Sequence, residues 1–245
     1  MLSAGGMFGA YQAGVWKALS GRFHPEIVVG ASVGALNAWA IAGGVAPGEL
    51  IEHWLAPECA SLATFRLMQP PWLGVFDARP LHAHIRRLWE TYLPRVDIGV
   101  VATGIPRFRP RLFRGPEIGW LHLAASCAVL LCYPQVRIEG RVYSDGGLLG
   151  ALPVWAAARM GATRIVAVNV LARAPSRLAG WAVRGFRTLA PGLPATPAEV
   201  KVCTISPSRP MGRLRDTVFW RREAVERWIE MGEEDAMRDY AWRLG

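Results

Sequence analysis

Lysine is almost absent from this chain of 245 residues. Only Lys17 and Lys201 occur, so arginine carries nearly all of the formal net charge of +9. The guanidinium fork matches phosphate oxygens and would favour phosphate-bearing partners, although an arginine- and alanine-rich composition also arises from genome bias. The sequence contains no nucleic-acid-binding motif, so we expect no nucleic-acid partner. A peripheral contact with an anionic membrane is the basic-surface hypothesis that remains.

Cysteine and metal-ligand patterns are equally sparse. The four cysteines show no paired metal spacing and lie mostly in apolar surroundings, which indicates buried thiols in a reducing compartment: Cys59, Cys127, Cys132 and Cys203. No acidic cluster has the spacing of a calcium loop. We therefore expect no metal and no cofactor.

The sequence also lacks a visible targeting or membrane-spanning segment. Residues 1–4 show no charged region followed by an apolar stretch, so no signal peptide is evident. The longest apolar run, 120–133, is too short to span a bilayer and predicts a buried helix. We expect a cytoplasmic protein, peripheral to the membrane at most; if the given start lies inside the first strand, upstream residues are missing from view.

Strand-like and helix-like segments alternate along the chain, and 52% of its residues are hydrophobic, which suits a single α/β domain over 1–245. A very short strand at 2–3 and runs at 27–29, 98–103, 111–113, 135–138, 141–143, 164–170 and 201–205 predict strands, and 10–19, 33–42, 47–54, 81–92, 121–131 and 153–160 predict helices. We expect a mainly parallel sheet covered by helices.

Three segments stand apart from this alternation. Residues 68–76 form an apolar, proline-broken loop that suits either a lid or a loop packed on the core. Residues 173–210 are rich in Pro, Arg, Ala and Gly, which indicates a mobile region or an insertion. Residues 213–244 carry apolar residues at helical spacing and predict a C-terminal helical region.

Ser32 lies in Gly30-Ala31-Ser32-Val33-Gly34, between the strand-like run 27–29 and a small-residue helical run. A serine in such an elbow occupies a strained turn, and flanking glycines leave room for the bend. The pattern makes Ser32 a candidate nucleophile, although glycines at a strand-to-helix turn also occur for purely structural reasons.

A second glycine-rich turn, Gly5-Gly6-Met7-Phe8-Gly9, joins the first strand to the first helix. Converging backbone N–H groups at this position suit an oxyanion hole next to Ser32. A dinucleotide fingerprint is disfavoured, because the acidic residue that it requires does not end the second strand. A Walker phosphate loop is excluded, because no Gly-Lys-Ser/Thr follows.

The base that would activate Ser32 is not an obvious histidine. None of the five histidines follows a late strand, as the α/β-hydrolase order requires: His24, His53, His82, His84 and His122. Asp145 closes a predicted hairpin, and Gly146 and Gly147 let the chain turn away while the carboxylate points at a neighbour. An Asp-Gly-Gly turn is by itself an ordinary turn, but its place after two glycine-rich turns favours Asp145 as the base.

These elements, in this order, resemble the patatin-like phospholipases. The matching stretches are Leu2–Val15, Gly30–Ala38 and Asp145–Gly147 with Leu152-Pro153-Val154 behind them; weaker echoes occur at 101–103, 125–126 and 231–236. The resemblance implies a three-layer α/β/α fold and a Ser–Asp dyad without histidine. It assigns Ser32 as nucleophile, Asp145 as general base, the Gly5 and Gly6 amides as oxyanion donors, and supporting roles to Gly9, Gly30, Gly34, Gly146 and Gly147.

The expected function is therefore that of a serine-dependent lipid acyl hydrolase, acting on phospholipids, lysophospholipids or simpler acyl esters. Three positions depart from the family pattern: Phe8 stands where Arg or Lys is usual, Ala4 where glycine is usual, and Ala151 where asparagine is common. These departures keep a second hypothesis open, a catalytically weak or inactive lipid- and membrane-binding module. A third hypothesis is an ordinary small-ester hydrolase with a histidine base.

Overall fold

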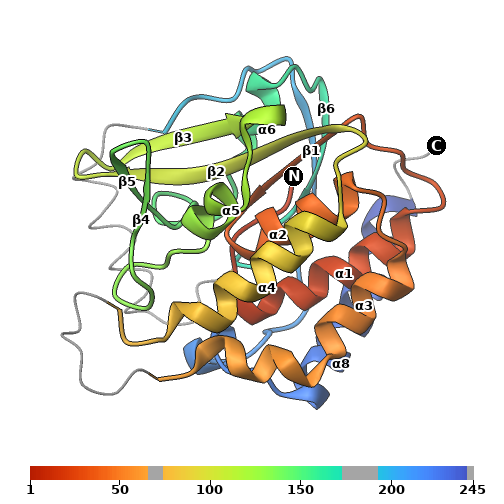
Figure 1. Ribbon diagram of the computed structural model, residues 1–245. Helices are drawn as coiled ribbons and strands as arrows, with labels where there is room; N and C mark the ends of the chain where they lie inside the picture. The colour runs from red at the N-terminus through yellow and green to blue at the C-terminus, as the bar shows by residue number, and fades with distance from the viewer. Residues whose placement is uncertain (66–73, 173–192, 242–245) are drawn as a thin grey trace.

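Seven strands and the helices around them make up the described part of the chain, residues 1–65, 74–172 and 193–241 of a computed structural model (Figure 1). The strands are β1 (Ile27–Ala31), β2 (Asp97–Ile105), β3 (Arg109–Arg114), β4 (Val136–Ile138), β5 (Arg141–Ser144), β6 (Arg164–Val168) and β7 (Lys201–Ile205). The helices are α1 (Gly9–Leu19), α2 (Val33–Ala42), α3 (Pro47–Leu55), α4 (Ala78–Thr91), α5 (Trp120–Ser126), α6 (Val154–Arg159) and α8 (Arg222–Ala241), with 3-10 turns η1 (Gly6–Phe8), η2 (Pro57–Ala63), η4 (Gly115–Glu117) and η5 (Leu214–Thr217). Most of the predicted apolar loop (68–73) and half of the predicted insertion (173–192) lie outside the described residues.

The predicted three-layer α/β/α fold is confirmed, but the sheet is mixed rather than mainly parallel. β1 pairs with β2 and β6 with β7 in parallel, and Leu2 bridges Gly30 and Val168 in parallel. β3 and β5 run antiparallel to β2, and β4 runs antiparallel to β5. For the β2–β3 and β4–β5 pairs the physical reason is the length of the connections: residues 106–108 and 139–140 are hairpin turns, whereas a parallel pair needs a crossover of a dozen or more residues.

Helices cover both faces of the sheet, so the central strands β1 and β2 are buried on either side. On one face, Val28 and Val100 belong to the large apolar core formed with α1, α2, α4, α5 and α8. On the other face, Val29 and Val101 pack with Trp155 of α6 in a smaller core. Figure 1 shows α6 on the opposite side of the strands from α1, α3 and α8. The alternation along β1 and β2 thus fixes which side chains face each layer.

The first and last helices pack closely because each has a glycine at the crossing. A Cβ atom on Gly14 of α1 would overlap the Ile229 carbonyl of α8, and one on Gly232 of α8 would overlap the Tyr11 carbonyl. The Tyr11 hydroxyl donates a hydrogen bond of 3.0 Å to Asp235 of α8, whose side chain is buried. This contact holds α8 against α1, which begins at the glycine-rich turn.

Gly14→Ala is expected to lower the free energy of unfolding by about 1–3 kcal/mol, because the new methyl group must push the two helices apart. Gly48→Ala is the matched control, since a Cβ atom on this glycine of α3 meets nothing within 4 Å. That substitution should be neutral or stabilising by up to about 1 kcal/mol. Urea denaturation of both variants measures the difference, and equal unfolding midpoints would contradict the glycine crossing.

Candidate active site

The sheet topology brings Ser32 and Asp145 together, because the strands that precede them, β1 and β5, meet end to end. Val101 of β2 pairs with Ala31 of β1, and Thr103 of β2 pairs with Ser144 of β5. Both β2 residues also pair with β3, so β1 and β5 must lie on the edge of β2 that β3 does not occupy. Because β1 is parallel and β5 antiparallel to β2, the two strands run toward each other. The residues that follow them, Ser32 and Asp145, therefore meet beside the middle of β2.

Ser32 occupies a strained elbow between β1 and α2. Its backbone angles, φ 54° and ψ −132°, are unfavourable for a residue with a side chain. A Cβ atom on Gly30 would overlap the Gly34 carbonyl, and one on Gly34 would lie 2.5 Å from the Leu2 and Ser3 carbonyls, so the bend requires both glycines. Such a turn presents the serine hydroxyl at the carboxyl end of the strand.

Ser126, at the end of α5, holds this elbow in place. It is fully buried, accepts a hydrogen bond of 2.8 Å from the Ser32 amide, and donates one of 2.6 Å to the Val101 carbonyl. The helix predicted over 121–131 ends at Ser126. The turn after it does not continue the helical hydrogen bonds, because the Ala128 carbonyl accepts hydrogen bonds from the Asp145 amide and the Ser144 hydroxyl. Ser126 therefore couples β1, β2 and the turn that holds Asp145.

Asp145 is 7% exposed, and its carboxyl group is fixed on one side only. Oδ1 accepts a hydrogen bond of 2.7 Å from the Gly147 amide, and the backbone carbonyl accepts one of 2.8 Å from the Thr103 hydroxyl. Oδ2 is buried without a hydrogen bond of good geometry within the described residues. Burial raises the pKa of Asp145 to about 6, and the Ser32 hydroxyl and the Gly147 amide oppose this rise. The carboxylate is thus a stronger base than an exposed aspartate.

The first glycine-rich turn passes directly beside the elbow. Leu2 pairs with β1 through hydrogen bonds to the Val29 carbonyl (2.8 Å) and from the Ala31 amide (3.2 Å), so the residues that follow Leu2 run alongside Ser32. Gly6 has a positive φ of 56°, and a Cβ atom on it would overlap the Thr217 carbonyl. The Gly5 and Gly6 amides form no hydrogen bond with the described part of the chain, which leaves them available to an anion.

The Asp-Gly-Gly turn completes the junction. A Cβ atom on Gly146 would overlap the Val101 carbonyl and lie 3.2 Å from the Ala31 side chain. One on Gly147 would overlap the side chain of Ala4. The three stretches that carry the resemblance therefore come into contact, and glycine is required at the points of closest approach.

A buried polar network that the sequence patterns did not predict supports the glycine-rich turn. Asn37 of α2 donates hydrogen bonds to the Gly9 carbonyl (3.0 Å) and to Gln12 (2.9 Å), and accepts one from the Trp54 indole (3.1 Å). Gln12 donates to the Ser3 carbonyl (2.8 Å). The available signal was the presence of amide side chains within two apolar helices, where buried polar groups need partners.

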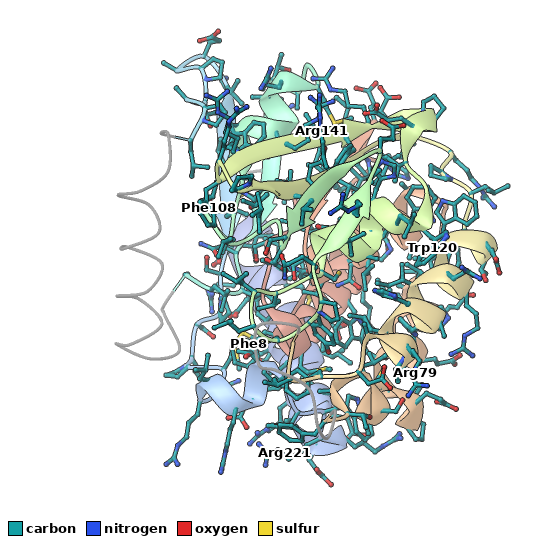
Figure 2. The ribbon with its side chains drawn as sticks, turned by 60° about the vertical axis from the view of Figure 1, so that its left-hand side comes forward. Phe8, Arg79, Phe108, Trp120, Arg141 and Arg221 are labelled. Atoms are coloured by element: carbon teal, nitrogen blue, oxygen red, sulfur yellow. The ribbon has the colours of Figure 1, made fainter. Side chains whose placement is uncertain are left out.

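Phe8, the main departure from the family pattern, is part of the core. It is 2% exposed, and its ring lies 4.9 Å from that of Trp228 in an edge-on arrangement. The Trp228 indole donates a hydrogen bond of 2.8 Å to the Met211 carbonyl. In Figure 2, Phe8 lies on the ribbon at the lower left of the molecule. An aromatic pair with α8 therefore stands where the resemblance predicts a cation.

The histidines have other contacts. His24 is exposed just before β1, at the end of the sheet opposite Ser32. His53 lies against Tyr92, His82 against Trp120, and His122 accepts a hydrogen bond from the Gly119 amide. Among the described residues, no histidine forms a hydrogen bond with Ser32 or Asp145.

The described residues hold neither a candidate metal site nor a candidate membrane span. They contain no group of three or more His, Cys, Asp or Glu side chains that could hold a metal ion, and no helix among them is long and apolar enough to cross a membrane. All four cysteines are free; Cys59 and Cys127 are buried, and Cys132 and Cys203 are half-buried.

The chain is similar to known proteins in sequence and in fold. The model of the patatin-like phospholipase family matches residues 1–158. Among solved structures, VipD from Legionella pneumophila is similar with a TM-score of 0.57 and 13% identity, over 98% of this chain and 66% of that one. The type III effector protein ExoU gives a TM-score of 0.44 and 13% identity, over 99% of this chain and 52% of that one. No curated protein matches the sequence significantly.

The family match covers more than half of the chain and includes both glycine-rich turns and Asp145. The chain therefore belongs to the patatin-like phospholipase family. It spans about two thirds of the length of VipD and about half that of ExoU. The likeness to VipD shows the shared fold, and the prediction of a single domain over residues 1–245 stays a prediction.

Proposed function

We propose that this protein is a serine-dependent lipid acyl hydrolase, with Ser32 as nucleophile and Asp145 as general base. The observation that carries the proposal is the opposed approach of β1 and β5 along one edge of β2, which brings the two residues next to each other. Membership of the patatin-like phospholipase family supports an acyl-ester substrate. Carboxylic esters of phospholipids, lysophospholipids or simpler alcohols fit this chemistry.

The first half of the reaction forms an acyl-enzyme. Ser32 Oγ attacks the ester carbonyl carbon while the Asp145 carboxylate takes the hydroxyl proton. The negative charge that develops on the carbonyl oxygen is stabilised by the Gly5 and Gly6 amides, which lie next to the elbow. The C–O bond to the alcohol then breaks, and Asp145 returns its proton to the departing alkoxide.

The second half releases the acyl group. The Asp145 carboxylate takes a proton from water, and the hydroxide attacks the acyl carbon of the ester on Ser32. Collapse of this intermediate frees the carboxylic acid and returns the proton to Ser32 Oγ. The same two side chains serve both halves, so the scheme requires no histidine, metal or cofactor.

A panel of acyl esters of increasing chain length, with and without phospholipid vesicles, tests the function. We expect release of free fatty acid from at least one phospholipid, lysophospholipid or simple ester by the wild-type protein. Vesicle binding without hydrolysis of any member would contradict the proposal and favour a catalytically inactive lipid-binding module.

A further inference from the structure

Exposed apolar side chains lie on η5, just after η5 and just after η2. Phe65 is 62% exposed, Leu214 is 48% exposed and Phe219 is 42% exposed. The ring of Phe65 lies 6.0 Å from that of Phe219 and 5.1 Å from that of Phe76. A contiguous group of exposed aromatic side chains marks an interaction site more often than scattered ones do.

Two segments connect this apolar group to the candidate active site. On one side, η5 contacts the first glycine-rich turn, because the Thr217 carbonyl lies against Gly6. On the other side, Val75 and Phe76 donate backbone hydrogen bonds to the carbonyls of Leu131 and Cys132, in the turn that follows α5. Leu131, in the same turn, is 58% exposed. That turn also holds Asp145 through the Ala128 carbonyl.

The same surface carries an excess of positive charge. Arg209, Arg213, Arg215, Arg221 and Arg222 fall within 14 residues that contain a single acid, Asp216. Arg209 pairs with Glu234 and Arg222 with Glu226, both on α8. Arg215 and Arg221 both contact Asp216, at 3.9 and 3.0 Å, and their side chains are 67% and 55% exposed. Arg213 is exposed beside them and bonds to Asp216 through its backbone amide only, so the two guanidinium groups of Arg215 and Arg221 share one carboxylate.

Exposed aromatic and aliphatic groups flanked by arginines have the chemistry of a membrane interface. Aromatic side chains favour the headgroup level of a bilayer, and the guanidinium fork binds lipid phosphate. We propose that Phe65, Leu214 and Phe219, with Arg213, Arg215 and Arg221, form a docking surface for an anionic phospholipid bilayer. Figure 2 shows Arg221 below Phe8 in the lower half of the molecule; the turn of Phe8 carries Gly5 and Gly6. The proposal rests on the proposed function, since docking here would place lipid esters beside Ser32.

Cosedimentation with vesicles tests this surface without hydrolysis, in a Ser32→Ala background. We expect the protein to bind vesicles of equal parts phosphatidylcholine and phosphatidylserine about tenfold more tightly than phosphatidylcholine alone, with a loss at high salt. The apolar double variant Leu214→Ser/Phe219→Ser and the charge double variant Arg213→Gln/Arg215→Gln should each weaken binding by about tenfold. Thermal unfolding checks that each variant is folded, and the charge variant leaves the apolar packing intact.

Two control positions lie at the end of the sheet opposite Ser32. Leu93 is 71% exposed before β2, and Arg22 is exposed before β1, so Leu93→Ser and Arg22→Gln should leave vesicle binding unchanged. Equal binding to both vesicle types, or losses no larger than those of the controls, would overturn the docking surface. Hydrolysis of the ester panel by the wild type, measured without vesicles, separates the two proposals: activity on at least one member persists if only the docking surface is wrong, and no member is hydrolysed if the proposed function is wrong.

Discussion

Replacing Ser32 by alanine is expected to lower kcat/KM for ester hydrolysis by about 10⁴-fold or more, because the acyl-enzyme cannot form without its hydroxyl. The elbow itself should persist: Gly30 and Gly34 make room for the bend, and Ser126 bonds to the backbone amide of residue 32 rather than to its side chain. Fatty-acid release from the best substrate of the ester panel measures the loss.

Ser20→Ala is the matched control for this prediction. Ser20 follows α1, at the end of the sheet opposite the elbow, and its hydroxyl bonds only weakly to the Lys17 carbonyl at 3.4 Å. This variant should hydrolyse esters at the wild-type rate. Activity of Ser32→Ala within tenfold of the wild type would remove Ser32 as nucleophile.

Asp145→Asn is expected to lower kcat by about 10²–10⁴-fold, the usual contribution of a general base. The amide side chain has nearly the shape of the carboxyl group and can still accept the hydrogen bond that Oδ1 receives from Gly147. It cannot take a proton from Ser32. Thermal unfolding should show a folded protein, and a folded variant with wild-type kcat would contradict the assignment of the base.

The pH dependence of the wild type belongs to the same test. Asp145 acts as a base only when ionised, and burial raises its pKa to about 6. Ester hydrolysis should therefore rise as the pH increases through about 6 and level off above it. A profile that is flat between pH 5 and 7 would contradict Asp145 as the base.

The local parts of the site were predictable from sequence. The turns at Gly5–Gly9, Ser32 and Asp145 are indicated by glycine spacing next to strand-like runs. The strand pairs bring Ser32 and Asp145 close to each other. The orientation of the strands was harder. An apolar run has the same appearance in a parallel or antiparallel pair, and only the short turns at 106–108 and 139–140 reveal the hairpins.

Contacts between distant segments could not be predicted. Phe8 and Trp228 are 220 positions apart in the sequence, and nothing in either local pattern indicates that the two rings meet. The role of Ser126 likewise depends on how α5 lies against β1 and β2. Such contacts arise from the packing of whole elements, which hydrophobic periodicity does not specify.

The acyl-enzyme is the central claim, and covalent labelling tests it most directly. An alkyl fluorophosphonate should react with the folded wild-type protein, and peptide mapping by mass spectrometry should find the adduct on Ser32. Labelling should be absent in Ser32→Ala and slower in Asp145→Asn. An adduct on another residue, or undiminished labelling of Ser32→Ala, would contradict the account.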